Sequence, residues 1–292
     1  MLIKSQVVRP RGRRDGGPGI NMSRWIFLPV SLTAFTITGI WLVYAMALTN
    51  KHVCPVDNWV YNQSCEQPLV MQMGSVLCCI PDNIPFISKC GTLPPESCVF
   101  SLISSTGSFM VMVIGLLRYA HVIERHRNCI LNVAGLSAGW ICAAGLLIVG
   151  NFQVDSSKVL HYIGAGVAFP TSMLFACLQS VLTYRLAHTQ REYHIAHLRS
   201  SLTVLAFITL VLSGAFFVQE SFALQHASAI CEWAFTVVIL VFFGTFAYEF
   251  SAVSNGTLLV LFQRASGERH HKSEAGVSSN SNSGQPENIS ML

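Results

Sequence analysis

Six long apolar runs decide what this chain can fold into. They cover residues 25–48, 99–117, 129–150, 159–184, 200–219 and 230–250. Each can cross a bilayer as a helix, because about 20 residues with a rise of roughly 1.5 Å each cover the hydrocarbon core. Charged residues make up only 11% of the chain, whereas soluble domains carry about 25%. We therefore predict an all-α membrane protein, a bundle of six transmembrane helices.

The basic residues indicate how the bundle is oriented. Of 18 Lys and Arg residues, 15 precede the first run or follow the second, fourth and sixth runs. Lys51, Lys89 and Lys158 fall on the other side. Because cytosolic segments carry the excess of Lys and Arg, we expect both termini in the cytosol and loop 49–98 outside. A cleaved signal peptide is the alternative for the first run, but that run exceeds the 7–15 apolar residues typical of one, which favours a signal anchor.

The two ends of the chain differ in composition from the six-span bundle, 25–257. Residues 1–24 are basic and residues 258–292 are rich in Ser, Asn and Gly, so we expect both to be disordered and cytosolic. The chain stops at Ser290-Met291-Leu292. A hydroxyl two residues before an apolar C-terminal residue suits the groove of a PDZ domain. The tail is therefore a candidate partner-binding segment, with a PDZ protein as one candidate partner.

Six of the ten cysteines lie in the outer loop: Cys54, Cys65, Cys78, Cys79, Cys90 and Cys98. An even set in an extracytosolic loop predicts a disulfide framework. Fifteen pairings are open, and we expect neighbouring Cys78 and Cys79 to bond to different partners. Zinc is the alternative, but the loop has one histidine, His52, and no CxxC motif. Asn62 is the one glycosylation sequon on the outer side.

Ionisable residues in the runs lie near their ends. Glu232 is third in the last run, Glu249 is close to its other end, and Arg118 follows the second run. Charged groups deep in a membrane are costly and usually functional, so this placement argues against proton-coupled transport. The sequence also lacks an HExxH motif. We expect no catalytic residues, no metal and no cofactor.

Small residues recur in two of the runs. Gly135, Gly139 and Ala143 are four residues apart, which places them on one helical face and permits close helix packing. Gly164 and Gly166 precede Pro170, which predicts a kink. We favour packing inside the bundle, and a self-association face is the alternative. A channel is a further alternative, because uncharged polar residues such as Gln179 lie in or beside the runs.

Several stretches resemble a known family. They are WIFLPVSLTAFTITGIWLV (25–43), CPVDNWVYNQSC (54–65), PPESCVFS (94–101), GNFQV (150–154), GAGVAFP (164–170) and GTFAYEF (244–250). Together they resemble the Frag/DRAM group of six-span membrane proteins and, within it, the A type of the transmembrane protein 150 family. The resemblance runs from about residue 22 to about residue 257. The tail is only weakly matched, and residues 1–21 precede the family pattern.

This resemblance implies a function that composition alone does not. Proteins of this type are non-enzymatic and are linked to recruiting a phosphatidylinositol 4-kinase complex to the plasma membrane, and so to phosphatidylinositol 4-phosphate synthesis. The chain is thus expected to be a plasma-membrane adaptor, with the cytosolic tail as the contact for the kinase complex. Other branches imply the alternatives: an autophagy modulator of endosomal or lysosomal membranes, or a modulator of a mechanosensitive channel.

Overall fold

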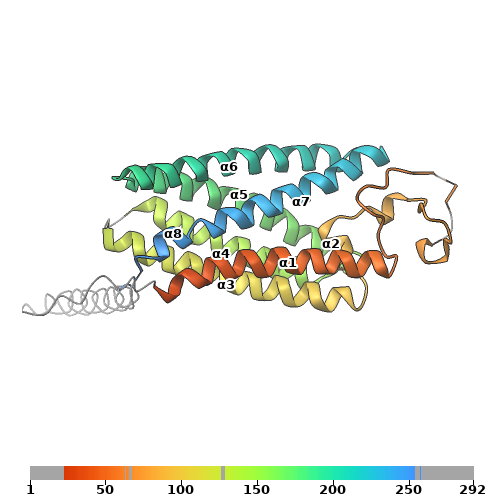
Figure 1. The fold of residues 1–292 in the computed structure, drawn as a ribbon, viewed down its shortest axis with the longest axis horizontal. Helices are drawn as coiled ribbons and strands as arrows, with labels where there is room; N and C mark the ends of the chain where they lie inside the picture. The colour runs from red at the N-terminus through yellow and green to blue at the C-terminus, as the bar shows by residue number, and fades with distance from the viewer. Residues whose placement is uncertain (1–22, 63, 66–67, 126–128, 254–256, 258–292) are drawn as a thin grey trace, which may run out of the picture.

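The computed structural model describes residues 23–62, 64–65, 68–125, 129–253 and 257. Within them, six helices are long and apolar enough to cross a membrane. They are α1 (Phe27–Thr49), α3 (Glu96–Arg125), α4 (Ile130–Asn151), α5 (Lys158–Leu186), α6 (Gln190–Phe217) and α7 (Phe222–Gly244). Two short helices, α2 (Ile87–Cys90) and α8 (Ala247–Phe250), flank them. All six long helices follow the long axis of the molecule (Figure 1). The predicted six-helix membrane bundle is confirmed.

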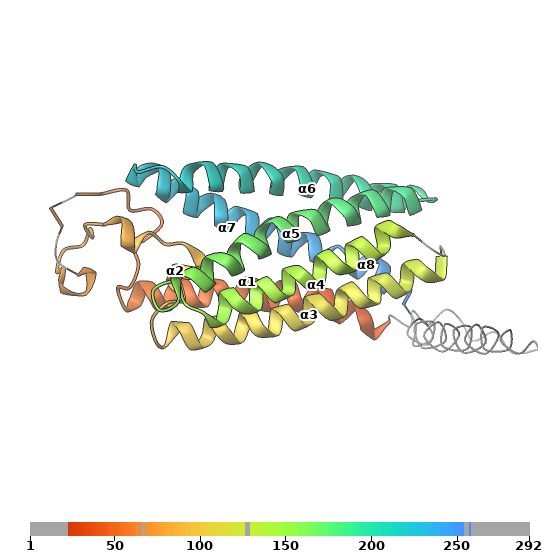
Figure 2. The ribbon, with the colours of Figure 1, turned by 180° about the vertical axis from the view of Figure 1, so that it is seen from behind.

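The long helices are arranged as a ring. Each packs against the next along the chain, in the order α1, α3, α4, α5, α6, α7, and α7 packs against α1 to close the ring. Figure 2 shows α3, α4 and α5 side by side on one face, with α6 along one edge. A ring of six helices, about 10 Å thick each, leaves room in its middle that side chains must fill. Phenylalanines fill the part near α8, where Phe175 stacks on Phe243 with ring centroids 5.1 Å apart.

The two ends of the bundle differ. Loop 50–95 lies at one end, which we call the loop end (Figure 1). The other, the terminal end, holds the first and last described segments. There the Ser23 hydroxyl donates a hydrogen bond of 2.6 Å to the Val253 carbonyl, so the chain enters and leaves the bundle at one place. An even number of spans requires this arrangement.

Several helices extend beyond the apolar runs. Helix α6 begins at Gln190, because Thr189 and Glu192 form a capping box that satisfies its first backbone N–H groups. Helix α3 continues to Arg125, and α7 begins at Phe222. Several charged residues that the apolar runs place in loops or at interfaces therefore lie inside helices.

Candidate functional site

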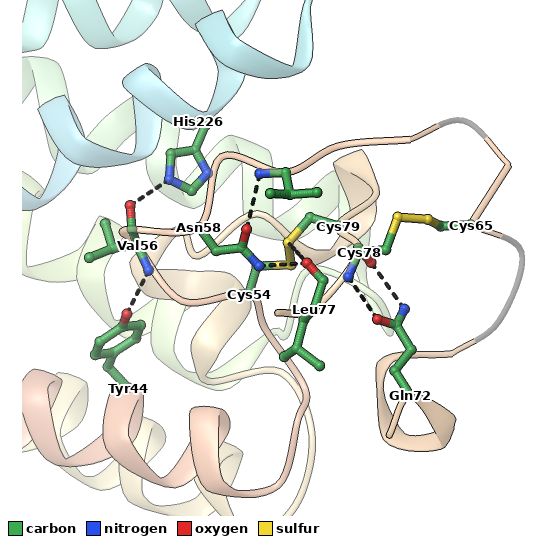
Figure 3. The surroundings of a disulfide bond; sticks show 11 residues. Tyr44, Cys54, Val56, Asn58, Cys65, Gln72, Leu77, Cys78, Cys79 and His226 are labelled. Carbon is green, nitrogen blue, oxygen red and sulfur yellow. Dashed lines mark hydrogen bonds between the residues drawn. A yellow bond between two sulfur atoms is a disulfide. The ribbon is translucent and has the colours of Figure 1, made fainter. Parts of the chain in front are cut away.

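Two disulfides hold loop 50–95. Cys54 bonds to Cys79, and Cys65 bonds to Cys78 (Figure 3). The neighbours Cys78 and Cys79 therefore have different partners, as we expected. The Gln72 side chain adds to this staple: its amide donates to the Cys78 carbonyl at 3.0 Å and accepts from the Cys78 N–H at 2.7 Å.

The other two disulfide candidates, Cys90 and Cys98, are not paired in the structure. Cys90 ends α2 and is buried in an apolar cluster with Ala47 and Phe100. Its burial raises the pKa of the thiol, and the nearby carboxylate of Glu232 adds to that shift. Cys98 lies in the first turn of α3 and is exposed. The framework therefore contains four of the six cysteines.

The stapled loop is fixed to the helices beneath it. The Val56 N–H donates to the Tyr44 hydroxyl of α1 at 2.9 Å, and His226 of α7 contacts the Val56 carbonyl through Nε2 at 2.8 Å (Figure 3). The Asn58 amide donates to the Leu77 carbonyl within the loop. Loop 50–95 is therefore attached to both α1 and α7 and forms a cap on the loop end.

Asn62 lies on this cap, three residues before Cys65. Its side chain is exposed, and its Oδ1 accepts a hydrogen bond of 3.0 Å from the Ser64 N–H. The structure thus leaves the sequon at the surface of the cap, where a glycan has room.

A buried ion cluster lies near the terminal end. Arg118 of α3 is 3% exposed and Arg199 of α6 is 0% exposed. Both face Glu249 of α8: the Arg199 Nη2 lies 2.8 Å from its Oε2, and the Arg118 Nη1 lies 3.5 Å from its Oε1. Arg199 also reaches the Oε1 through Nη1, so its guanidinium binds the carboxylate with both branches. The cluster ties α3 and α6 of the ring to the short helix α8.

Neutral side chains complete the cluster. Gln179 Oε1 accepts from Arg118 at 3.2 Å, and the Thr245 hydroxyl accepts from Arg199 Nε at 2.8 Å. The Arg199 guanidinium also lies over the Phe246 ring, 4.3 Å from its centroid. These contacts matter because a buried charge without partners is costly. Two cations and one carboxylate leave an excess positive charge that these polar and aromatic partners stabilise.

Sequence reasoning missed this cluster, although one signal was available. The apolar runs placed Arg118 and Arg199 in cytosolic segments and Glu249 at an interface. The capping box at Thr189 and Glu192 is visible in the sequence and starts α6 ten residues before position 200. It places Arg199 almost three turns inside a helix rather than in a loop. No comparable signal identifies which carboxylate that partner is.

Glu232 lies farther from the start of its helix than from the start of the apolar run. Because α7 begins at Phe222, Glu232 sits about 15 Å along the helix, at roughly 1.5 Å per residue. Its Oε1 accepts from the Ile87 N–H of α2 at 3.2 Å. The cap therefore meets α7 at Glu232, well inside that helix.

The small residues lie mostly where helices touch. A Cβ on Gly135 would be 2.7 Å from the Gln179 amide nitrogen, and one on Gly139 would be 3.2 Å from the Phe175 ring. One on Gly164 would be 3.0 Å from a backbone nitrogen of α4. Ala143, on the same face of α4, is buried. This face of α4 is thus occupied by α5 within the chain.

The two other candidate positions of α5 are Gly166 and Pro170. A Cβ on Gly166 would meet nothing within 4 Å. Pro170 lies inside α5, which is continuous from Lys158 to Leu186, and the Thr171 hydroxyl donates to the Val167 carbonyl at 2.6 Å. Gly166 therefore faces open space rather than a neighbouring helix.

The remaining sequence-based candidates, Ser290, Met291 and Leu292, lie outside the described residues. Among the residues that are described, no group of three His, Cys, Asp or Glu side chains is placed to hold a metal ion.

Comparison with known families identifies the bundle. The family described as the Frag1/DRAM/Sfk1/Cwh43P N-terminal domain matches residues 24–253, which are the six helices and the cap. The chain belongs to this family. Transmembrane protein 150A of Xenopus laevis is 57% identical over 242 residues, covering 83% of this chain and 89% of the relative. The human protein of that name is 53% identical over 271 residues, covering 93% and 100%.

More distant members of the family also match. The Xenopus laevis protein named modulator of macroautophagy TMEM150B-A is 31% identical over 229 residues, 78% of this chain and 87% of the relative. No solved structure matches the chain. The match to the human transmembrane protein 150A extends over that relative's full length.

Proposed function

We propose that the chain is a non-enzymatic plasma-membrane adaptor that regulates the localisation of a phosphatidylinositol 4-kinase complex, and so phosphatidylinositol 4-phosphate synthesis. One observation carries the proposal: the similarity to transmembrane protein 150A over nearly the whole chain. That branch of the family is the one whose resemblance implies kinase recruitment.

The geometry supports an adaptor whose tail acts in the cytosol. The first and last described segments meet at the terminal end, and the excess of basic residues assigns that end to the cytosol. The ion cluster holds Glu249 only a few residues before the tail, residues 258–292. A soluble kinase complex would therefore bind a segment whose starting point is fixed to the bundle.

The outer features complete the proposal. The cap lies outside the cell, where disulfides persist, and we propose that Asn62 carries a glycan there. A glycosidase should lower the mass of the unsubstituted chain and leave the mass of Asn62→Gln unchanged, which tests this assignment. On the cytosolic side we propose that Ser290–Leu292 bind a PDZ domain.

Kinase recruitment is tested by changing the tail alone. Cells that lack their own transmembrane protein 150A receive the full chain, a chain without residues 258–292, or a chain with the residues of that tail in shuffled order. We expect the full chain alone to raise the kinase signal at the plasma membrane and the phosphatidylinositol 4-phosphate sensor signal. Removing only Ser290–Leu292 separates a PDZ contact from a kinase contact.

The controls measure the amount of each variant at the cell surface by biotinylation. If the tailless and shuffled chains recruit the kinase as well as the full chain at equal surface amounts, the tail is not the contact. If the full chain changes neither signal, the adaptor function itself is rejected.

A second candidate function follows from the relatives named modulators of macroautophagy, at 31% identity. It requires the chain to reside on endosomes or lysosomes and to change autophagic flux. Imaging of a tagged chain together with a flux measurement separates this function from the adaptor, because the adaptor acts at the plasma membrane.

A further inference from the structure

The ring of helices encloses a cavity of about 860 Å³. On α5 its lining runs from Lys158 to Pro170, about 18 Å along the helix at roughly 1.5 Å per residue. Leu32, Val111 and Leu240 line its deep part. Pockets that bind small molecules typically have volumes of about 300–1,000 Å³ and mostly apolar walls. In size and lining, this cavity is typical of a ligand site.

Three acidic residues line this cavity: Asp82, Asp155 and Glu232. Glu232 lines the cavity, and its Oε1 accepts a single hydrogen bond from the Ile87 N–H at 3.2 Å. Among the described side chains it forms no ion pair. Two lysines also line the cavity, Lys89 and Lys158. Lys89 is bound to Asp155 at 2.7 Å, and neither lysine forms an ion pair with Glu232 among the described side chains. A half-buried carboxylate that faces an apolar cavity is best stabilised by a cation or by several donors. Among the described side chains and backbone groups, Glu232 has one donor and no cation.

The cavity also has a side that faces the lipid. Gly166 of α5 and Gly214 of α6 both line it, and a Cβ on either would meet nothing within 4 Å. Figure 2 shows α5 running away from α6 toward the loop end. A molecule in the leaflet on the loop side can therefore reach the cavity between these two helices, without crossing the cap.

We propose that the cavity binds a single-chain amphiphile with a protonated amine, taken from the leaflet on the loop side. The ammonium group pairs with Glu232, and the alkyl chain lies along the apolar lining. The cavity volume falls within the range typical of pockets for drug-sized ligands, so the cavity can hold one alkyl chain and a small head group. The positive charge is required because it is the partner that Glu232 lacks. A long-chain amino alcohol such as sphingosine has this chemistry.

The test uses the full chain purified in detergent micelles and a photoactivatable, alkyne-tagged sphingosine. We expect saturable cross-linking to peptides of α5, α6 or α7, competed by unlabelled sphingosine. A long-chain alcohol with the same photoactivatable group but no amine should cross-link at least tenfold less. A tagged phosphatidylethanolamine tests a two-chain lipid with the same head-group charge on its amine.

Three variants separate charge from space. Glu232→Gln keeps an acceptor for the Ile87 N–H but loses the charge, and we expect at least a tenfold loss of affinity for the amine. Glu220→Gln, at an exposed glutamate outside the lining, is the matched control and should bind as the unsubstituted chain does. Gly166→Leu keeps Glu232 and fills the open side, so it should also reduce cross-linking.

Several outcomes overturn the proposal. Equal cross-linking of the amine and the alcohol removes the role of the charge, and so does unchanged binding by Glu232→Gln. Preferential labelling by phosphatidylethanolamine replaces the single-chain ligand. If Glu232→Gln does not elute as a folded protein, the amine–alcohol comparison and Gly166→Leu still decide. The test is independent of kinase recruitment, because it measures ligand binding to the purified chain.

Discussion

Replacing Glu249 by Gln should destabilise the bundle more than almost any other single polar change. The carboxylate is the one acidic group bound by both Arg118 and Arg199, and its side chain is only 10% exposed. Glutamine keeps the size of the side chain and loses the charge. It leaves two guanidinium groups buried side by side without a counter-ion.

The expected magnitude follows from this geometry. Removing one partner of a buried ion pair typically costs about 3–5 kcal/mol of unfolding free energy, because an uncompensated charge stays in a medium of low dielectric constant. Arg118→Met should cost less, about 1–3 kcal/mol, the price of leaving the buried Gln179 without its donor. That variant keeps the two-branched contact between Arg199 and Glu249. The order of the two losses is therefore the sharper prediction.

The assay is unfolding by sodium dodecyl sulfate in mixed micelles, followed by tryptophan fluorescence. The matched control is Arg125→Gln, which breaks the pair of Arg125 with Glu192 at 3.0 Å. Arg125 is 46% exposed, so we expect a loss of only about 0.2–1 kcal/mol. A loss for Glu249→Gln no larger than that of the control, or smaller than that of Arg118→Met, would refute the buried ion cluster.

Two further predictions concern the cap and the helix contacts. In the folded chain a maleimide should label Cys98 and leave Cys90 unlabelled up to pH 9, because burial both shields the Cys90 thiol and raises its pKa. Peptide mass spectrometry before and after denaturation measures the labelling of each cysteine. Labelling of Cys90 before denaturation would contradict the prediction. Gly145→Ala should lose about 1–3 kcal/mol of unfolding free energy, because its Cβ would lie 2.8 Å from a backbone nitrogen of α5. Gly166→Ala is the matched control and should lose much less; equal losses in the same detergent assay would contradict the close contact.

The helix count followed from the sequence because one physical requirement dominates it. A span must hide its backbone and present apolar side chains to lipid, so each run is visible by composition alone. The residues at which the helices begin and end could not be predicted from composition in the same way. Helix α6 continues to Gln190 through polar residues, since capping and packing, rather than lipid, stabilise that part. Hydropathy cannot detect it.

The sites were predictable to different degrees. The sequence placed the disulfides in the right loop, but six cysteines allow many pairings. Only the fold shows that Cys90 is buried in an apolar cluster with Ala47 and Phe100, while Cys54 meets Cys79. The position of Glu232 within its helix was also hidden from the sequence. The apolar run begins at residue 230, whereas α7 begins at Phe222, so a residue near the end of the run is well inside the helix.

The buried charges also bear on the orientation of the bundle. The excess of basic residues on one side counted Arg118 and Arg199 as loop charges, but both are buried and bound to Glu249. Leaving them out does not change the conclusion, because the other basic residues of that side still far outnumber Lys51, Lys89 and Lys158. The cluster itself adds to the asymmetry: it has more cations than anions at the terminal end, whereas unpaired Glu232 lies toward the loop end. The buried charges and the loop charges are therefore both more positive at the terminal end than at the loop end. Both distributions favour insertion with the terminal end in the cytosol.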